Sequence, residues 1–328
     1  MLSAGFLILH VLAGSMDMAK SPEPGGHPRS YAVIEAPSNL GLRPPRPGAQ
    51  PGVRRLPEAL EAAGFSQRIG AERAGRVEPP PYTGAIDPKS GIREAPAVRD
   101  YSLRLAEAVG KAIDGGKFPV VLGGDCSILL GNLLALRNRG RYGLFFLDSH
   151  TDFATPETSA SKAAAGMDLA LATGHGPAPL SNLDPRGPLV REEDVVLLGV
   201  RGLPPEWRKM ITSTRMTMYE LDALRRDGIA NRIRQELAKM KERGVKGFWI
   251  HLDADVLDDA VMPAVDSRQP GGLSFDELTL TLRELLASPL AAGLHIGIYD
   301  PDLDPKGEAG RALTDALVRA LAAPSAKR

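Results

Sequence analysis

Hydrophobic and polar positions follow one another along this chain in blocks that predict strands separated by helices. Apolar runs typical of buried strands cover residues 31–36, 118–124, 142–148, 194–200, 247–253 and 293–299. Helical periodicity covers residues 56–64, 99–113, 127–138, 229–243, 274–287 and 307–322. Near-continuous apolar strands that alternate with helices predict an α/β protein whose parallel sheet is covered on both faces.

Helix-start and loop signals between these blocks support the same interpretation. Ser274 and Glu277 form the sequence pattern of a capping box, which predicts a helix start there. Two long loops rich in Pro and Gly, at 37–57 and 77–97, are long enough to suggest a functional role. No internal repeat interrupts the pattern, so we expect one domain.

Acidic residues at alternate positions end two of the apolar strands. The stretch LFFLDSHTDF gives Asp148, His150 and Asp152, and the stretch HLDAD gives Asp253 and Asp255. Alternate residues of a strand face the same side. Ligands of parallel α/β sheets bind beyond the carboxyl ends of the strands, so we expect these side chains to converge there.

Four carboxylates in one small volume repel one another unless protons or cations neutralise them. Oxygen ligands combined with an imidazole suit Mn²⁺, Fe²⁺, Co²⁺ or Zn²⁺ better than Ca²⁺. The number of acids predicts two metal ions rather than one.

Four further residues are candidates for the site, each with a structural alternative. Cys126 lies in a GGDCS turn between a strand and a helix, and is either a metal ligand or a small buried side chain. His251 shares a strand face with Asp253 and orients a carboxylate more readily than it binds metal. Asp300 and Arg268 are candidates for substrate contact, or ordinary loop residues.

Composition narrows the choice of partners and compartment. The chain has 328 residues with 40 basic and 40 acidic side chains, and this balance argues against a nucleic-acid partner. Its single cysteine rules out an intrachain disulfide and fits a cytoplasmic protein. Residues 2–14 are apolar but too short to span a membrane, and they indicate either a non-functional leader or an export signal.

Taken in order, Gly-Gly-Asp-X-Ser at 123–127, Asp-X-His-X-Asp at 148–152 and Asp-X-Asp-X-X-Asp at 253–258 resemble the motifs of the ureohydrolase family. This family includes arginase, agmatinase, guanidinobutyrase and formimidoylglutamase. The resemblance implies a three-layer α/β/α sandwich with a mainly parallel sheet over residues 31–323, between a disordered leader at 1–30 and a tail at 324–328. It also implies a homo-oligomer of three or six subunits.

The same resemblance implies a binuclear manganese centre and a reaction. Asp148 and Asp253 would bridge the two ions, with Cys126 and Asp152 at one ion and His150 and Asp255 at the other. A hydroxide between the ions would hydrolyse a C–N bond of a small guanidino or amidine compound. Asp152, which would orient that hydroxide, and His251 are the candidate catalytic residues.

This chain departs from the family pattern at four places. Cys126 stands where a histidine ligand is expected, which makes Zn²⁺, Fe²⁺, Co²⁺ or Ni²⁺ alternatives to Mn²⁺. Ala165 occupies the place of a proton-shuttling histidine, and residues 298–301 read Ile-Tyr-Asp-Pro instead of Glu-Val-Asn-Pro. Gly202 replaces an aspartate. The expected metal ligands are mostly retained, whereas the residues expected to contact the substrate differ from the family pattern. We therefore do not assume that arginine is the substrate.

Three functions are therefore compared. The first is a metal-dependent hydrolase of the ureohydrolase type. The second is a non-catalytic relative that binds metal or ligand on the same scaffold. The third is a deacetylase-like amidohydrolase, which would release acetate rather than urea or ammonia.

Overall fold

The computed structural model describes Met1 and residues 29–322, so most of the expected leader and all of the 324–328 tail lie outside the described residues. In the described part of the chain, eight strands form one parallel sheet in the order β2-β1-β3-β8-β7-β4-β5-β6. The strands are β1 (Tyr31–Glu35), β2 (Glu72–Arg76), β3 (Phe118–Leu122), β4 (Gly143–Leu147), β5 (Val195–Val200), β6 (Thr217–Glu220), β7 (Phe248–Asp253) and β8 (Ala291–Gly297). The six predicted strands are confirmed, each with ends within two residues of the prediction.

The two edge strands, β2 and β6, were missed by the sequence pattern. Every residue of β2 is exposed, and β6 is half-buried, so neither carries an apolar run. On β2, Arg73 and Arg76 donate hydrogen bonds to the Glu35 carboxylate of β1 at 2.6 and 2.8 Å. Main-chain pairing with β1 and these charged contacts to Glu35 hold β2 in place. Both interactions depend on β1 and not on the sequence of β2 alone.

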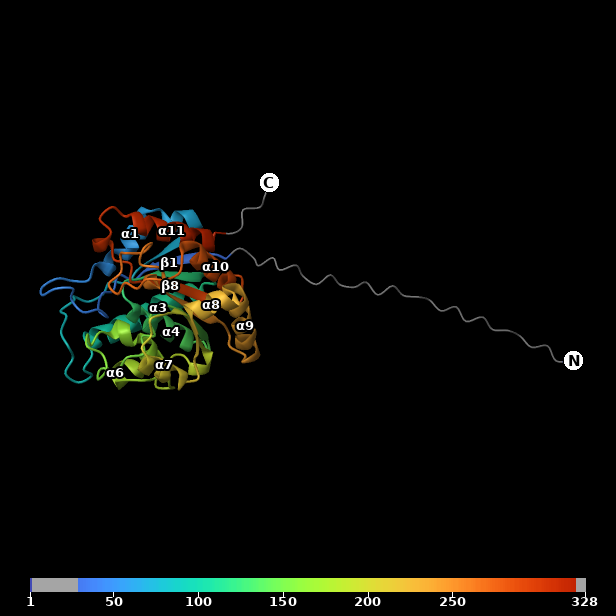
Figure 1. Cartoon of the computed structure of the whole chain (residues 1–328), viewed down its shortest axis with the longest axis horizontal. Helices are drawn as coiled ribbons and strands as arrows, with labels where there is room; N and C mark the ends of the chain where they lie inside the picture. The colour runs from blue at the N-terminus through green and yellow to red at the C-terminus, as the bar shows by residue number, and fades with distance from the viewer. Residues whose placement is uncertain (2–28, 323–328) are drawn as a thin grey trace.

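Helices cover both faces of the sheet, as Figure 1 shows. One face carries α1 (Leu56–Ala62), α2 (Phe65–Ile69), α8 (Leu221–Asp227), α9 (Ile229–Glu242), α10 (Phe275–Leu286) and α11 (Glu308–Leu321). The other carries α3 (Ala95–Asp114), α4 (Leu129–Arg137), α5 (Asp168–Ala172), α6 (Ala178–Ser181) and α7 (Pro205–Thr212). The expected three-layer sandwich is confirmed, and its sheet is parallel throughout.

Short 3-10 turns link several of these elements. They are η1 (Gly52–Arg55), η2 (Cys126–Ile128), η3 (Ala164–Met167), η4 (Glu192–Asp194), η5 (Ala254–Val256) and η6 (Pro301–Leu303). Of these, η5 directly follows β7, and η2 and η6 begin within four residues of the ends of β3 and β8. They turn the chain sharply where the strands end, and so keep the following side chains close to the sheet edge.

Central strands bury both of their faces, which explains their unbroken apolar sequences. Phe145 and Leu147 of β4 pack in the core on the α10 side, and Leu144 and Phe146 pack in the core on the α4 side. Complete burial of each large apolar side chain contributes roughly 1.5–3 kcal/mol. This continuous core fixes the level at which each strand ends.

Helix boundaries differ from prediction mainly where segments predicted as loops contain helical residues. The predicted helix at 99–113 begins earlier, at Ala95, so the predicted 77–97 loop is shorter. The predicted helix at 56–64 corresponds to α1, which ends at Ala62, and a separate helix, α2, begins after Gly64, which adopts a left-handed backbone. No helix within the described ranges is long and apolar enough to cross a membrane.

The turn after β3 depends on the absence of a side chain at Gly124. A Cβ atom there would lie 1.6 Å from the carbonyl oxygen of Ser38. The Asp125 N–H bonds that same carbonyl at 3.1 Å, and Asp125 accepts a 2.6 Å hydrogen bond from the Ser38 hydroxyl. This close packing of two loops delivers Cys126 to the edge of the sheet.

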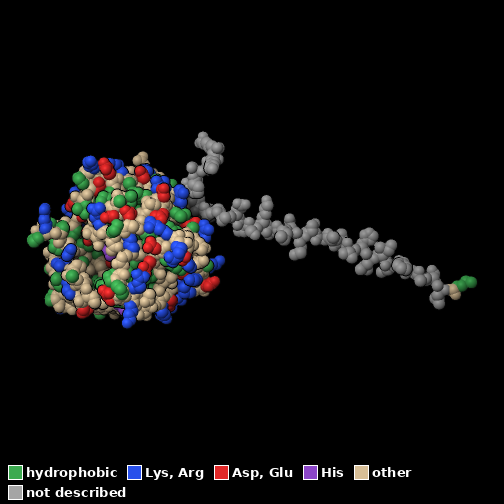
Figure 2. Space-filling model, viewed as in Figure 1, with side chains coloured by type: hydrophobic (Ala, Val, Ile, Leu, Met, Phe, Trp, Pro, Cys, Tyr) green, Lys and Arg blue, Asp and Glu red, His purple; other side chains and the backbone are tan. Residues whose placement is uncertain are grey.

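Charges of both signs are interspersed over the molecular face in Figure 2, without a large patch of one sign. This distribution agrees with the zero net charge of the sequence. A steering field for a polyanion requires a basic patch or stripe. The view therefore offers no support for nucleic-acid binding on that face.

The capping box predicted for α10 is confirmed and supports a pH prediction. The Glu277 carboxylate accepts the Ser274 N–H at 2.8 Å and is paired by Arg225 at 2.8 and 2.9 Å. The hydrogen bonds from Arg225 lower the pKa of Glu277 to about 2, from 4.5. This depressed pKa means that the ionised carboxylate stabilises the fold above about pH 4.5, a contribution lost as the pH falls toward 2.

We therefore expect Glu277→Gln to lower the free energy of unfolding by about 1 kcal/mol at pH 7, after allowance for solvent screening. The difference from wild type should shrink between pH 5 and pH 3 in urea titrations. Asp276→Asn on the same helix is the control, since Asp276 is 93% exposed. A Glu277→Gln effect that is independent of pH would contradict the assignment.

Candidate metal centre

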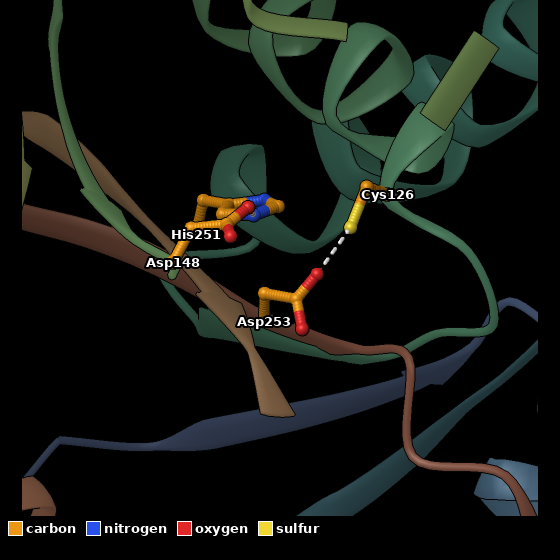
Figure 3. A group of neighbouring side chains, drawn as sticks. All are labelled: Cys126, Asp148, His251 and Asp253. Carbon is orange, nitrogen blue, oxygen red and sulfur yellow. Dashed lines mark hydrogen bonds and ion pairs between the residues drawn. The ribbon is translucent and has the colours of Figure 1, made fainter. Parts of the chain in front are cut away.

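The carboxyl ends of β3, β4 and β7 bring the predicted acids together. Leu147 of β4 pairs with Leu252 of β7, so Asp148 and Asp253 follow at the same level on neighbouring strands. Figure 3 shows both carboxylates facing Cys126, whose thiol donates a 3.0 Å hydrogen bond to Asp253 Oδ2. Residues more than a hundred positions apart in the chain therefore share one site.

Three overlapping groups of potential ligands occur at this edge. Within each group, one ligand atom of every residue lies within 4.8 Å of the others. The groups are Cys126, Asp148, His251 and Asp253; Asp148, His150 and Asp255; and Cys126, Asp152 and Asp168. Two atoms bound to one ion at 2.0–2.3 Å cannot be more than about 4.6 Å apart. The structure thus brings together all six predicted ligands at separations that metal ions could bridge with small adjustments.

Electrostatics on the His150 side favour ionised groups. His150 Nδ1 lies 2.9 Å from Asp255 Oδ2 and 3.4 Å from Asp148 Oδ1. Burial opposes the charged imidazole, but the bonds to Asp148 and Asp255 raise the pKa of His150 to about 12. Burial likewise raises the pKa of Asp148, yet the hydrogen bond from His150 outweighs it and lowers that pKa overall. The imidazolium supplies one positive charge among these acids.

The Cys126 side holds more acid than base. Burial first, and then the charges of Asp255 and Asp148, raise the pKa of Asp253 well above its usual value. Burial and the charge of Asp253 do the same to the pKa of the Cys126 thiol. Asp148 Oδ2 is buried without a hydrogen-bond partner. Divalent cations would neutralise the negative charge of these crowded acids and would give the unpartnered oxygen a ligand bond. The donor set therefore fits metal ions.

A chain of buried hydrogen bonds runs behind the site. The Trp249 indole N–H donates to His295 Nδ1 at 2.8 Å, and His295 Nε2 lies 2.7 Å from His251 Nδ1. Burial lowers the pKa of His295 well below its usual value, so its ring is neutral. Since its Nδ1 accepts from tryptophan, its Nε2 carries the proton and donates to His251.

The Trp249–His295–His251 hydrogen bonds fix the tautomer of His251. Its Nδ1 accepts from His295, so its proton lies on Nε2, which faces Asp148 Oδ2 at 3.7 Å. A nitrogen that carries a proton cannot also bind a metal ion. Although Nε2 lies among the ligand atoms, the geometry favours the predicted orienting role of His251 over a ligand role.

The side chains of both predicted substrate contacts bond backbone groups. Arg268 is on an exposed loop and donates a 3.2 Å hydrogen bond to the Asp259 carbonyl. The Asp300 carboxylate accepts hydrogen bonds from the backbone N–H groups of Gly52 at 3.1 Å and Asp302 at 2.8 Å. Both of its oxygens are therefore occupied by backbone donors. Neither arrangement supports contact with a substrate, and neither residue enters the proposal below.

Several residues at the site were missed by the sequence reasoning. Gln269 and Ser267 contact His150 Nε2 at 3.0 and 3.2 Å, and no sequence signal marks these loop residues. Asp168 and His295 did carry a signal, because each is a lone polar residue in an apolar run. Such a residue needs a buried partner.

A cavity of about 230 Å³ opens above His150 and Asp152. Its walls include the apolar side chains Phe153, Leu203 and Trp207. Arg201 also lines it, but its guanidinium donates to five backbone carbonyls of residues 255–257, 269 and 270. Arg201 therefore braces the surrounding loops, and the cavity can admit only a small molecule.

Comparison with known proteins agrees with this architecture. A family model described as "Arginase family" matches residues 29–323. The chain is 31% identical to an arginase of Bacillus caldovelox over 291 residues, which cover 85% of this chain and 94% of that protein. It is 30% identical to an arginase of Bacillus subtilis over 299 residues, covering 89% and 97%. The chain belongs to the arginase family.

Solved structures support the same conclusion. The Bacillus caldovelox arginase superimposes with a TM-score of 0.82 at 28% identity, covering 91% of this chain and 100% of that one. A formimidoylglutamase of Bacillus subtilis has a TM-score of 0.68 at 19% identity, covering 95% of each chain, and shares the fold. At the level of the family, the chain is related to metal-dependent hydrolases of guanidino compounds.

The hydrogen-bond chain behind Asp148 predicts an effect of Trp249→Phe. Without the indole donor, His295 and His251 can exchange tautomers, and we expect nitrogen NMR to show both forms of His251 instead of the Nε2–H form alone. Metal affinity should fall about 10–100-fold, as is typical when a group that orients a ligand is removed. Trp207→Phe in the cavity wall is the control. An unchanged His251 spectrum in Trp249→Phe would show that the hydrogen bond from Trp249 does not set the tautomer of His251.

Proposed function

We propose that this protein hydrolyses a C–N bond of a small guanidino or amidine compound at a binuclear metal centre. The observation that carries the proposal is the convergence of buried, mutually close ligand atoms below a small cavity. Membership of the arginase family supports the reaction class. On the family resemblance alone, we also propose a cytoplasmic homo-oligomer of three or six subunits.

Six residues would hold the ions. Asp148 and Asp253 lie on adjacent strands and are suited to bridge two ions, as the family resemblance implies. Cys126 and Asp152 would complete one position, and His150 and Asp255 the other. Two divalent ions, when bound, lower the pKa of a shared water and so supply a nucleophile at neutral pH. Manganese is the family expectation, and the Cys126 thiol also admits Zn²⁺, Fe²⁺, Co²⁺ or Ni²⁺.

Asp152 is proposed to orient the nucleophile. It lines the cavity beside His150, and its backbone is held in the left-handed region at φ 39°, a conformation rare for aspartate. Its carbonyl accepts the Ala170 N–H at 3.3 Å, which ties this conformation to α5. A fixed carboxylate at the cavity floor can accept a hydrogen bond from water and point its lone pair at the substrate.

The cavity walls bear on the choice of substrate. Phe153, Leu203 and Trp207 provide an apolar surface, and Arg201 is already occupied by backbone carbonyls. The acids below would attract a cationic head group. We therefore favour a guanidino compound with a short apolar tail over an amino acid.

A non-catalytic relative is the second candidate. It is favoured by Ala165, which is buried where arginases carry the proton-shuttling histidine. Ile298 likewise stands where the family has a glutamate, and it is buried in the core with a φ of 71°. These two positions supply neither a proton carrier nor a carboxylate for the substrate. Turnover separates the two candidates, whereas metal content does not.

The deciding experiment is a screen of guanidines, amidines and formimino compounds with the metal-loaded protein, measuring urea and ammonia. We expect turnover of at least one compound, and Asp148→Asn or Asp253→Asn should abolish it together with metal binding at both positions. Glu284→Gln is the control, since Glu284 lies on α10 and pairs with Arg234 of α9. Near-normal turnover in either aspartate variant would reject the bridging roles. Metal binding without any turnover would favour the non-catalytic relative, and acetate release would favour a deacetylase-like enzyme.

Cys126→His tests the contribution of the thiol to metal choice. If Cys126 is a ligand, replacing sulfur by an imidazole nitrogen should raise the affinity for Mn²⁺ relative to Zn²⁺, because thiolates favour the softer ion. The measurement is competitive metal binding followed by elemental analysis. An unchanged metal profile would mean that Cys126 only fills space in the core.

A further inference from the structure

Asp168 is a buried acid that has no hydrogen-bond partner and that none of the roles above uses. It is 0% exposed, and neither carboxylate oxygen has a partner of normal hydrogen-bond geometry. Burying an ionised carboxylate costs several kcal/mol unless a cation or hydrogen bonds compensate it. A residue kept in such a position needs a partner that the protein chain alone does not supply.

The side chain of Asp168 points at the Cys126 end of the site. One of its oxygens lies within 4.8 Å of both the Cys126 sulfur and an Asp152 oxygen, and those two atoms are equally close to each other. Cys126 also belongs to the group that contains Asp148 and Asp253. Asp168 thus belongs to the same overlapping cluster, in the group of Cys126 and Asp152 and not in the group of His150.

The backbone around Asp168 is fastened on both sides. The Ala165 N–H donates to the Gly41 carbonyl at 2.9 Å, and the Gly166 carbonyl accepts the Ala154 N–H at 3.2 Å. Beyond Asp168, the Ala170 N–H donates to the Asp152 carbonyl at 3.3 Å. The start of α5, which carries Asp168, is therefore tied directly to the loop that carries Asp152, and this fixes where the short side chain of Asp168 reaches.

The charges that act on Asp168 are mainly negative. Burial and then the charge of Asp148 raise the pKa of Asp168 well above its usual value, and the Leu169 backbone N–H only partly opposes them. Asp253 and Asp125 act in the same direction as Asp148. No cationic side chain is among these main influences, so a bound proton or a metal ion would have to neutralise this carboxylate.

We propose that Asp168 is a metal ligand, which together with Cys126 and Asp152 forms one end of the metal centre. This inference rests on the proposed binuclear function. A thiolate with two carboxylates is a mixed sulfur and oxygen donor set that suits Zn²⁺ or Co²⁺ better than Mn²⁺. Asp168 thereby adds a protein ligand, beyond Cys126, Asp152 and the two bridging aspartates, at the position where Cys126 replaces the nitrogen ligand expected from the family pattern.

Cobalt titration of the full-length, metal-depleted protein tests the proposal. Wild type should bind two equivalents, with a thiolate-to-cobalt absorption from Cys126. In Asp168→Asn, we expect the Cys126-side ion to bind at least about 100-fold more weakly, beyond the 10–100-fold loss typical of groups that merely orient a ligand. The visible cobalt bands of that position should change as well. Glu236→Gln is the matched control, since Glu236 is a fully buried acid with an unpartnered oxygen on α9.

The outcomes separate this inference from the proposed function. If wild type binds two equivalents and Asp168→Asn binds them equally well with unchanged bands, Asp168 is not a ligand and the hydrolase proposal stands. If wild type binds no metal, both proposals fail.

A second measurement does not depend on a variant that folds. In a crystal of the zinc-loaded wild type, anomalous scattering should place an ion about 2.0–2.2 Å from an Asp168 oxygen. An ion bound by Cys126 but lying beyond about 3 Å from Asp168 would overturn the assignment.

Discussion

Mutual repulsion of buried carboxylates at one edge of the sheet is the constraint on which the rest of the structure depends. Asp148, Asp253 and Asp255 lie at the ends of two adjacent strands, and Asp152 and Asp168 reach the same volume from a loop and from the start of α5. The pKa values of Asp253 and Asp168 are raised by burial and by neighbouring acids. Such a cluster is tolerable only with protons or cations among the carboxylates, because water cannot screen charges there. The fold holds these groups close together and so creates the demand for metal ions.

Rigid support surrounds this unfavourable arrangement. Arg201 ties the loops after β7 together through five backbone carbonyls, and the Trp249–His295–His251 chain holds the ring that faces Asp148. Gly124 lets two loops approach closely enough to present Cys126. These contacts offset the tendency of the acids to move apart, which keeps their geometry suited to small divalent ions.

The family resemblance assigns residues to a metal end and to a substrate end of the site, and this chain matches it better at the metal end. All six residues that the family resemblance assigns to metal are brought into the cluster. The places of the shuttle histidine and the substrate glutamate hold Ala165 and Ile298, both buried. The chemistry supplied by metal ions depends little on the substrate's tail, so one end can be retained while the other changes.

The sequence by itself determined the parallel sheet, its helical layers and the acids at the ends of β4 and β7, because strand periodicity and local residue order encode them. The edge strands β2 and β6 could not be predicted, since their exposed residues are held by pairing with a neighbour. Only the tertiary structure joined Asp168 to Cys126 and showed that both oxygens of Asp300 accept backbone N–H groups. Contacts between distant loops depend on how the whole core packs, and no local pattern records that.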